Sequence, residues 1–255
     1  MVTKLKALVP PFLEPALIGL WYFLRPIVRL LFFGRKRYCP ICDSHCRLFL
    51  SHGRGARSRP DVVCPVCLCH DRHRFAYLYL KASTDLYAGL PKRFLHFAPE
   101  PEFSRQFKRI PCIDYVSADW ASPHSSRKID ITNTRLPDSS FDAIFCSHVL
   151  EHVVEDRRAI QELFRVLTPG GWAVIVVPIG EPSQTIEFPR TSNGSDQPSW
   201  HTRHVRSYGM DFQERLLEAG FDVQAVSARQ IASAQDCERM SLITFEPLFF
   251  CRKPA

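Results

Sequence analysis

The chain has 255 residues, of which 45% are hydrophobic and 23% are charged, so it is long enough for one sizeable core and a small additional module. This composition excludes an intrinsically disordered chain and a collagen-like fibre. The formal net charge is +7, but residues 1–75 contain 13 basic and four acidic side chains, whereas residues 76–255 contain 20 basic and 22 acidic ones. The sequence therefore has a basic N-terminal head and a nearly neutral body.

Ten cysteines make up only about one residue in 25, well below the roughly 8–10% that is typical of secreted disulfide scaffolds. Four of them form C-x2-C pairs, and most of the others are scattered through apolar segments, as small core residues are. This usage predicts a reducing compartment, and we therefore expect a cytoplasmic protein.

The most hydrophobic stretch is residues 7–33, but Glu14, Arg25, Arg29 and several prolines interrupt it. Its longest charge-free run is ten residues, whereas a helix that spans a bilayer needs about 20. We therefore predict an apolar, basic helical arm over residues 1–34 and no transmembrane helix. Two roles fit this pattern: a helix in the membrane interface, where basic residues meet anionic lipid, or an arm that packs on the body or on a second subunit.

Two near-identical C-P-x-C pairs lie in the head, at Cys39, Cys42, Cys64 and Cys67. Each pair places two thiols on one tight turn, and two such turns complete the tetrahedral four-sulfur site that is typical of structural zinc. We therefore predict that these four cysteines bind Zn²⁺ in a zinc-ribbon-like module over residues 35–75. Cys69 or His70 could substitute for one of the four if a pair is misassigned.

Residues 76–255 alternate short apolar runs with helical patterns, which predicts a doubly wound, mostly parallel Rossmann-like sheet. The predicted strands are residues 94–97, 115–119, 128–131, 141–146 and 172–178, followed by β-rich runs at 221–226 and 242–251. The predicted helices are residues 101–108, 155–167 and 210–219.

Ligands of such sheets bind beyond the carboxyl ends of the strands. The residues that follow the predicted strands are Ala98 to Glu100, Asp119, Asp130, Ser147 and His148. An acidic residue about 20 positions after the first strand-to-helix turn suits the hydroxyl groups of a ribose. Asp119, 21 positions after Ala98, meets this requirement.

Two stretches of the body resemble class I S-adenosylmethionine-dependent methyltransferases of the type 11-like group. They are SHVLEH at residues 147–152 and LTPGG at residues 167–171, and the likeness extends over about residues 93–226. Residues 204–209 and 218–221 resemble a subgroup that also has two N-terminal C-x-x-C pairs and an HFAPE turn. The resemblance implies S-adenosylmethionine as the cofactor of a methyltransferase-like domain, and it accounts for the cysteine pairs as well.

The resemblance implies a role for each position that matches the family. Asp119 would hold the ribose hydroxyls, and Asp130 with Ile131 would contact the adenine edge. Ser147 and His148 would flank the methionine part of the cofactor.

The first turn departs from the family, because the usual D-x-G-x-G-x-G is replaced by HFAPEPE at residues 96–102, which contains no glycine. Glycines there let the backbone approach the cofactor, and the two prolines also remove amide donors. We therefore expect Glu100 to bind the amino group of the methionine part, with His96 and Ala98 in the same cofactor-binding turn.

Methyl transfer from a sulfonium is an in-line displacement, so the protein supplies alignment and, for an oxygen or nitrogen acceptor, a base. Histidine titrates near neutral pH, and His148 and His204 are the candidate bases, ahead of His152. The loop 179–203 is rich in Gly, Pro, Ser and Thr, and we expect it to form a lid or part of the acceptor site.

Together these patterns predict a methyltransferase domain over residues 76–255 that acts on a small-molecule, glycan or lipid-linked acceptor. Residues 7–33 would hold the protein peripherally on the inner face of a membrane. One alternative is a zinc-ribbon nucleic-acid-binding or RNA-modifying protein, which uses a cluster of arginines: Arg54, Arg57, Arg59, Arg72 and Arg74. Nucleic acid is the weaker partner, because no aromatic residues for base stacking are interleaved with these arginines. Another alternative is an inactive methyltransferase-like binding protein, which the glycine-free turn favours.

Overall fold

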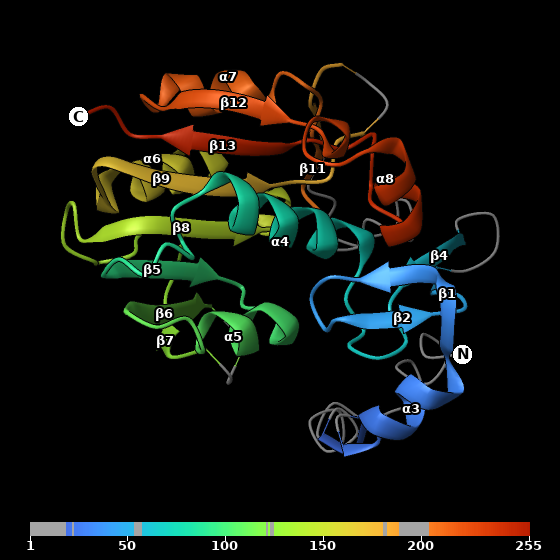
Figure 1. The fold of residues 1–255 in the computed structure, drawn as a ribbon. Helices are drawn as coiled ribbons and strands as arrows, with labels where there is room; N and C mark the ends of the chain where they lie inside the picture. The colour runs from blue at the N-terminus through green and yellow to red at the C-terminus, as the bar shows by residue number, and fades with distance from the viewer. Residues whose placement is uncertain are drawn as a thin grey trace. The chain divides into compact units, whose positions relative to one another are not determined.

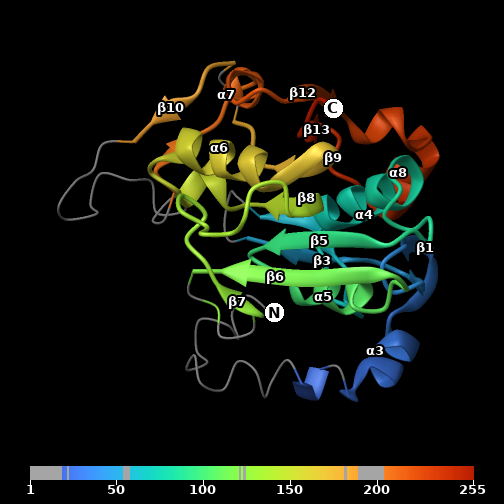
Figure 2. The same ribbon diagram turned by 90° about the vertical axis from the view of Figure 1, so that its left-hand side faces the viewer.

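The computed structural model describes residues 19–21, 23–53, 58–120, 122, 125–180, 183–188 and 204–255. The chain divides into two compact units (Figures 1 and 2). The first comprises Met1–Thr84 and Ala228–Thr244, and the second comprises Asp85–Ser227 and Phe245–Ala255. The first unit therefore extends beyond the predicted module boundary at residue 75 and includes a segment from late in the chain.

The second unit is built on a seven-stranded sheet with the order β12-β13-β9-β8-β5-β6-β7. Its strands are β5 (Lys92–Phe97), β6 (Ile113–Asp119), β7 (Arg127–Lys128), β8 (Phe141–Ser147), β9 (Leu167–Val176), β12 (Asp222–Val226) and β13 (Leu248–Arg252). The strands from β9 to β7 in this order are parallel, and β13 pairs antiparallel with both β9 and β12. The predicted doubly wound, mostly parallel fold is confirmed.

Helices cover both faces of this sheet (Figure 1). The helical elements are α5 (Pro101–Phe107), η3 (Leu150–His152), α6 (Asp156–Val166) and α7 (Phe212–Glu218), and a small separate pair of strands is β10 (Ile186–Glu187) and β11 (Arg206–Ser207). Leu95 and Phe97 of β5 belong to the core that contains the apolar side chains of α6 and α7. Phe94 and His96 point to the other face, where their rings lie 4.8 and 5.4 Å from the ring of Phe107 on α5. Burial on both faces explains why residues 94–97 of β5 show no alternation between buried and exposed positions.

The first unit contains two antiparallel hairpins and several helices. The hairpins are β1 (Phe33–Cys39) with β2 (Ser44–Cys46) and β3 (Leu50–His52) with β4 (Arg59–Val63). The helices are α3 (Arg25–Leu31), α4 (Asp71–Ser83), η4 (Ala228–Gln230) and α8 (Ala234–Met240). Within the ranges given above, no helix is long and apolar enough to cross a bilayer.

The structure differs from the predicted elements mainly near the C-terminus. The β-rich run 242–251 becomes a strand only from Leu248, because the residues before Phe245 belong to the first unit. The helix α8 was not predicted, since only Cys237 and Met240 in it are buried and two positions make a weak periodic signal.

Candidate active site

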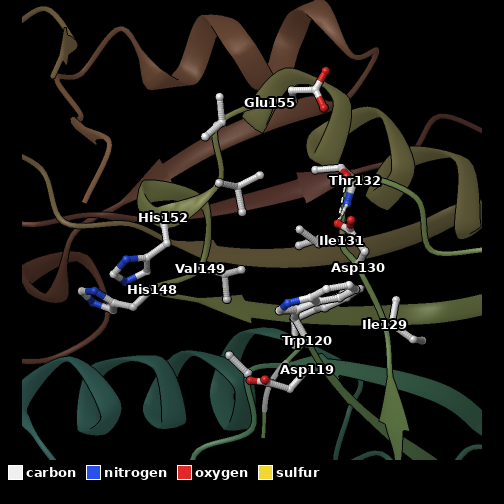
Figure 3. Close-up of a pocket in the computed structure, with 14 residues that line it drawn as sticks. Asp119, Trp120, Ile129, Asp130, Ile131, Thr132, His148, Val149, His152 and Glu155 are labelled. Atoms are coloured by element: carbon white, nitrogen blue, oxygen red, sulfur yellow. Dashed lines mark hydrogen bonds between the residues drawn. The ribbon is translucent and has the colours of Figure 1, made fainter. Parts of the chain in front are cut away.

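A cavity of about 760 Å³ lies at the carboxyl ends of β5, β6 and β8 (Figure 3). This is where ligands bind in an open α/β sheet, and ligand pockets usually enclose about 300–1,000 Å³. The cavity is lined by residues from the ends of these strands and from η3 and its flanks: Phe97, Ala98, Asp119, Trp120, Ile129, Asp130, Ile131, Thr132, His148, Val149, His152, Val153, Val154 and Glu155.

Two predicted cofactor-binding carboxylates, Asp119 and Asp130, line this cavity, as does the predicted adenine contact Ile131. Asp119 ends β6, and its Oδ1 accepts a hydrogen bond from the backbone N–H of Ser122 at 2.6 Å. Oδ1 of Asp130 accepts a hydrogen bond from the backbone N–H of Thr132 at 2.9 Å. These bonds fix the orientation of both carboxylates at the cavity wall, as a binding site requires.

Trp120 is a large lining side chain that sequence reasoning missed. It is 65% exposed, and the ammonium nitrogen of Lys128 lies 5.3 Å from its ring centroid. The available signal was its position directly after Asp119, because an exposed aromatic ring at a strand end offers a flat surface on which a base can stack.

The glycine-free turn after β5 brings one of its three predicted residues to the cavity. Ala98 lines the cavity with a φ of 48°, a left-handed conformation that glycine adopts more readily. The imidazole of His96 is fully buried, and its ring nitrogens lie 2.9 Å from Oε2 of Glu100 and 3.0 Å from the hydroxyl oxygen of Tyr115. Among the described residues, the cavity lining includes neither His96 nor Glu100.

The turn after β8 carries His148, which lines the cavity with a φ of 54°. Its Nδ1 lies 3.0 Å from Oε1 of Glu151, a fully buried side chain on η3. Burial raises the pKa of Glu151, but the hydrogen bond and the charge of His148 outweigh burial, so that the pKa is lowered. Ser147 is buried at the end of β8 and is not among the lining residues described.

His204 lies against His152, with the two ring centroids 4.7 Å apart. Burial lowers the pKa of His204; Glu151 opposes this shift, whereas His152 and His148 add to it. The net lowering favours the neutral imidazole, which can accept a proton. The two predicted bases thus approach one buried carboxylate, while most of the predicted loop 179–203 lies outside the described residues.

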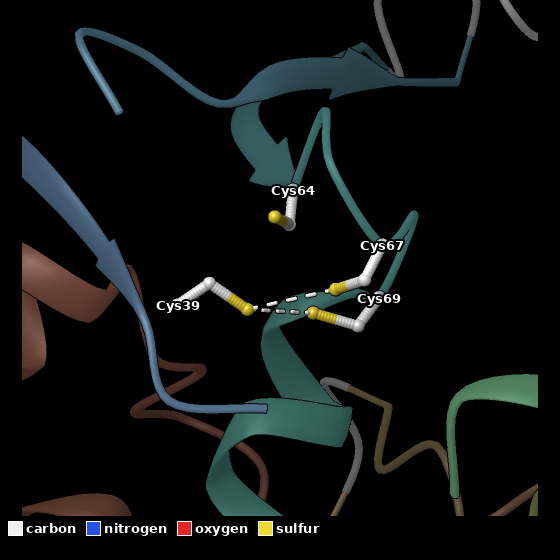
Figure 4. A group of neighbouring side chains, drawn as sticks. All are labelled: Cys39, Cys64, Cys67 and Cys69. Atoms are coloured by element: carbon white, nitrogen blue, oxygen red, sulfur yellow. Dashed lines mark hydrogen bonds between the residues drawn. The ribbon is translucent and has the colours of Figure 1, made fainter. Parts of the chain in front are cut away.

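In the first unit, four buried thiols converge so that all their sulfur atoms lie within 4.8 Å of one another (Figure 4): those of Cys39, Cys64, Cys67 and Cys69. Sγ of Cys39 lies 3.6 Å from Sγ of Cys67 and 3.4 Å from Sγ of Cys69. Sγ of Cys42 lies 3.7 Å from Sγ of Cys64. Four sulfurs about 2.3 Å from zinc form a tetrahedron with edges of about 3.8 Å, so these spacings suit a zinc ion. Cys69 thus joins three of the predicted ligands, and Cys42 stays beside them as a fifth thiol.

Two arginines of the predicted nucleic-acid surface, Arg59 and Arg74, contact other parts of the first unit. Arg74 is fully buried. Its guanidinium donates to four backbone carbonyls at 2.5 to 3.2 Å, those of Val62, Cys69, Met240 and Ser241. Arg59 forms an ion pair with Asp71. Arg74 therefore holds the first unit together and is not available to a phosphate.

Comparison with known proteins agrees with this geometry. Residues 101–175 match the model of the Methyltransferase domain family. A probable S-adenosylmethionine-dependent methyltransferase of Mycolicibacterium smegmatis is 31% identical over 125 residues, which cover 46% of this chain and 45% of that protein. A demethylmenaquinone methyltransferase of Paenarthrobacter aurescens is 40% identical over 68 residues, which cover 27% of this chain and 22% of that protein. The chain thus spans less than half the length of these relatives.

A solved structure shows the same fold. Phosphoethanolamine N-methyltransferase 2 of Haemonchus contortus, in complex with phosphomonomethylethanolamine and S-adenosylhomocysteine, superposes with a TM-score of 0.50 at 13% identity, over 72% of this chain and 53% of that one. The sheet order, the position of the cavity and the match of residues 101–175 to the Methyltransferase domain family make the second unit similar to class I S-adenosylmethionine-dependent methyltransferases, and we refer to it below as the methyltransferase domain.

Proposed function

We propose that the protein transfers the methyl group of S-adenosylmethionine to a small-molecule, glycan or lipid-linked acceptor. The observation that carries this proposal is the cavity at the carboxyl edge of a methyltransferase sheet, with Asp119 and Asp130 in its wall. In this proposal Asp119 accepts hydrogen bonds from the ribose hydroxyls. The adenine lies against Ile131 near Asp130, and Trp120 offers a further surface for stacking.

The methionine part of the cofactor would extend along the turns after β5 and β8. Ala98 and His148 line this region, and Ser147 immediately precedes His148 in the sequence. Glu100, held by His96 at 2.9 Å, supplies the carboxylate that we propose for the amino group.

The chemical step needs little from the protein besides alignment and a base. The acceptor oxygen or nitrogen forms a bond to the methyl carbon as the carbon–sulfur bond breaks, and the bonding electrons stay on sulfur to give a thioether. His148 and His204 are the proposed acceptors of the proton that the nucleophile loses. The carboxylate of Glu151 orients the ring of His148 through Nδ1 and leaves Nε2 to act as the base.

Calorimetry with S-adenosylhomocysteine tests the cofactor site. We expect binding by the full chain and at least about tenfold weaker binding by Asp119→Ala, because a hydrogen bond to a charged group contributes about 1.5–3 kcal/mol. Asp114→Ala is the matched control, since Asp114 lies on the same strand with a 61% exposed side chain. Absence of binding by the unaltered protein would favour the alternative of a catalytically inactive methyltransferase-like protein that binds a partner.

We also propose that the converging thiols hold a structural Zn²⁺ ion. Cys39, Cys64 and Cys67 are common to the predicted set and to the tightest four, and Cys69 or Cys42 supplies the fourth sulfur. A closed four-thiolate site of this kind stabilises a small module and leaves no position for a substrate. The predicted role of these residues is therefore structural.

For the N-terminal arm we propose peripheral contact with an anionic membrane surface from the cytoplasmic side. The basic face of α3 points inward, because Nε of Arg25 donates to the carbonyl of Val66 at 3.1 Å and Nη2 of Arg29 donates to the carbonyl of Cys42 at 2.6 Å. Apolar side chains on α3 and just before it are exposed, including Leu30 at 78% and Phe23 at 80%, whereas Val28 is buried. In this proposal the apolar face of α3 meets the lipid, and not its arginines as the sequence predicts. The residues before position 19 lie outside the described part.

Flotation of the full chain with anionic and with neutral liposomes tests this proposal. We expect the doubly substituted Phe23→Ser, Leu30→Ser protein to float less with anionic liposomes than the unaltered protein, because apolar burial and charge both contribute to interfacial binding. Equal flotation of the two proteins would contradict membrane contact through α3.

A further inference from the structure

A second group of side chains with metal-ligand chemistry lies in the methyltransferase domain, apart from the cysteines. One ligand atom each from Glu151, His152 and His204 lies within 4.8 Å of the other two. Glu151 and His152 are neighbours on η3, whereas His204 comes from the segment that leads into β11. Two imidazoles and one carboxylate form a ligand set that suits a divalent transition metal and leaves further coordination positions open.

Hydrogen bonds to backbone carbonyls of η3 hold the segment that carries His204 in place, and they require no metal ion. The backbone N–H of Val205, the residue after His204, donates to the carbonyl of Glu151 at 2.8 Å. Nη1 of Arg206 donates to the carbonyl of Leu150 at 3.0 Å. The segment that carries His204 is therefore fixed against η3, so the three side chains are organised in advance.

The buried carboxylate of Glu151 has room for a further interaction partner. Oε1 accepts the hydrogen bond from His148, whereas Oε2 is buried and has no hydrogen-bond partner among the residues that the structure describes. A buried, unpaired carboxylate oxygen is costly, and a bound cation removes that cost. A histidine that donates to a metal-binding carboxylate also fixes its orientation, as outer groups commonly do around metal sites.

We propose that Glu151, His152 and His204 bind one divalent transition-metal ion, with His148 as the base that also orients the carboxylate of Glu151 through Nδ1. His152 and His148 line the cavity, so the open coordination positions of the ion face the proposed acceptor site. This last point rests on the proposed methyl transfer and narrows the acceptor to one that carries a hydroxyl oxygen.

The chemistry follows from the charge of the ion, which makes a coordinated hydroxyl more acidic. The hydroxyl proton passes to Nε2 of His148, the oxygen forms its bond to the methyl carbon, and the carbon–sulfur bond breaks with its electrons on sulfur. In this arrangement His204 binds the ion, and His148 is the base.

Titration of the full chain with Co²⁺, after its thiols have been saturated with Zn²⁺, tests the site separately from the cysteines. We expect one Co²⁺ per chain, with visible d–d bands and without the near-ultraviolet charge-transfer band of a cobalt thiolate. Glu151→Gln and His204→Ala should abolish this binding, and His148→Ala should weaken it by about 10–100-fold. Glu218→Gln is the matched control, because Glu218 has a 55% exposed side chain elsewhere in the same domain.

Two further measurements keep the outcomes distinct. Thermal melting of each variant identifies any that fails to fold, and the half-buried position of His204 makes His204→Ala the more robust of the two ligand variants. Co²⁺ binding that is absent, or unchanged in a folded His204→Ala protein, overturns the metal site. Binding of S-adenosylhomocysteine in the same samples reports on the proposed methyl transfer independently.

Discussion

The two clusters of candidate metal ligands differ in both chemistry and surroundings. The cluster in the first unit consists of soft thiols, and its four convergent members are all buried. The cluster in the methyltransferase domain consists of imidazoles and a carboxylate, and His152 reaches a cavity. Closed thiolate sites usually support a fold, whereas mixed sites with open positions take part in reactions. If both proposed sites bind metal, this chain separates structural support from chemistry between its two units.

The largest effect is expected from Cys39→Ser, which tests the structural half of the comparison. Zinc binding contributes about 10–16 kcal/mol to the folding of small zinc modules, so we expect loss of one zinc per chain and unfolding of the first unit. Elemental analysis and hydrogen exchange would measure the two effects. Cys112→Ser is the control, because Cys112 is an exposed cysteine in the other unit. Undiminished zinc in Cys39→Ser would contradict a zinc site at these thiols.

A paired experiment identifies the fourth thiol. If Cys69 completes the site, Cys69→Ser should lose zinc while Cys42→Ser keeps it, because the four sulfurs of the tightest group already satisfy a tetrahedral ion. Loss of zinc from Cys42→Ser but not from Cys69→Ser would instead support the four ligands that the spacing of the two pairs predicts.

Arg74→Met should lower the free energy of unfolding of the first unit by about 3 kcal/mol or more. The substitution leaves four carbonyl acceptors without their donor, and each hydrogen bond to a charged group contributes about 1.5–3 kcal/mol. Denaturant unfolding measures the change. Arg47→Met, at an exposed position in the same unit, is the control and should stay within about 0.5 kcal/mol of the unaltered protein.

We expect low pH to lower the stability of the methyltransferase domain by protonating Glu162, which belongs to neither proposed metal site. Hydrogen bonds from Arg165, followed by those from Thr134, lower the pKa of Glu162 to about 2. Because an unfolded glutamate titrates at about 4.3, the stabilisation is present above that pH and is lost as the pH falls toward 2. Glu162→Gln should therefore be less stable than the unaltered domain at neutral pH, with a difference that shrinks below about pH 4. Unfolding curves at several pH values check this, with Glu214→Gln, an exposed position, as the control.

The smallest effect is expected at the turn after β5. A left-handed conformation costs a non-glycine residue about 1–2 kcal/mol, whereas glycine adds about 0.5–1 kcal/mol of unfolded-state entropy. Ala98→Gly should therefore change the free energy of unfolding by only about 1 kcal/mol, in the stabilising direction. Destabilisation well beyond that amount would mean that the methyl group of Ala98 contributes packing that the φ of 48° does not reveal.

Much of the fold could be predicted because its signals are local. The buried parallel strands are rich in apolar residues, and Asp119 stands where one of them, β6, ends. The two C-x2-C pairs likewise identified the thiol-rich module. Sequence spacing could not show that Cys69 lies closer to the other thiols than Cys42 does, because this depends on how two separate turns face each other.

Other features depend on contacts between distant parts of the chain. The cluster of Glu151, His152 and His204 forms only because the segment before β11 returns to η3, and no local pattern indicates that return. Glu100 was predicted at the cofactor, but the partner that holds it, His96, is visible only in three dimensions.

The positions of the four carbonyls that Arg74 binds determine when the first unit can finish folding during translation. Two of them belong to Met240 and Ser241, so the first unit lacks its closing segment until residues more than 160 positions after Arg74 have been translated. Ribosomes add about 5–20 residues per second, so the 166 residues from Arg74 to Met240 take about 8–33 seconds to be added. During that interval the guanidinium of Arg74 lacks two of its four carbonyl partners. The first unit therefore cannot be completed until nearly all of the second unit has been translated.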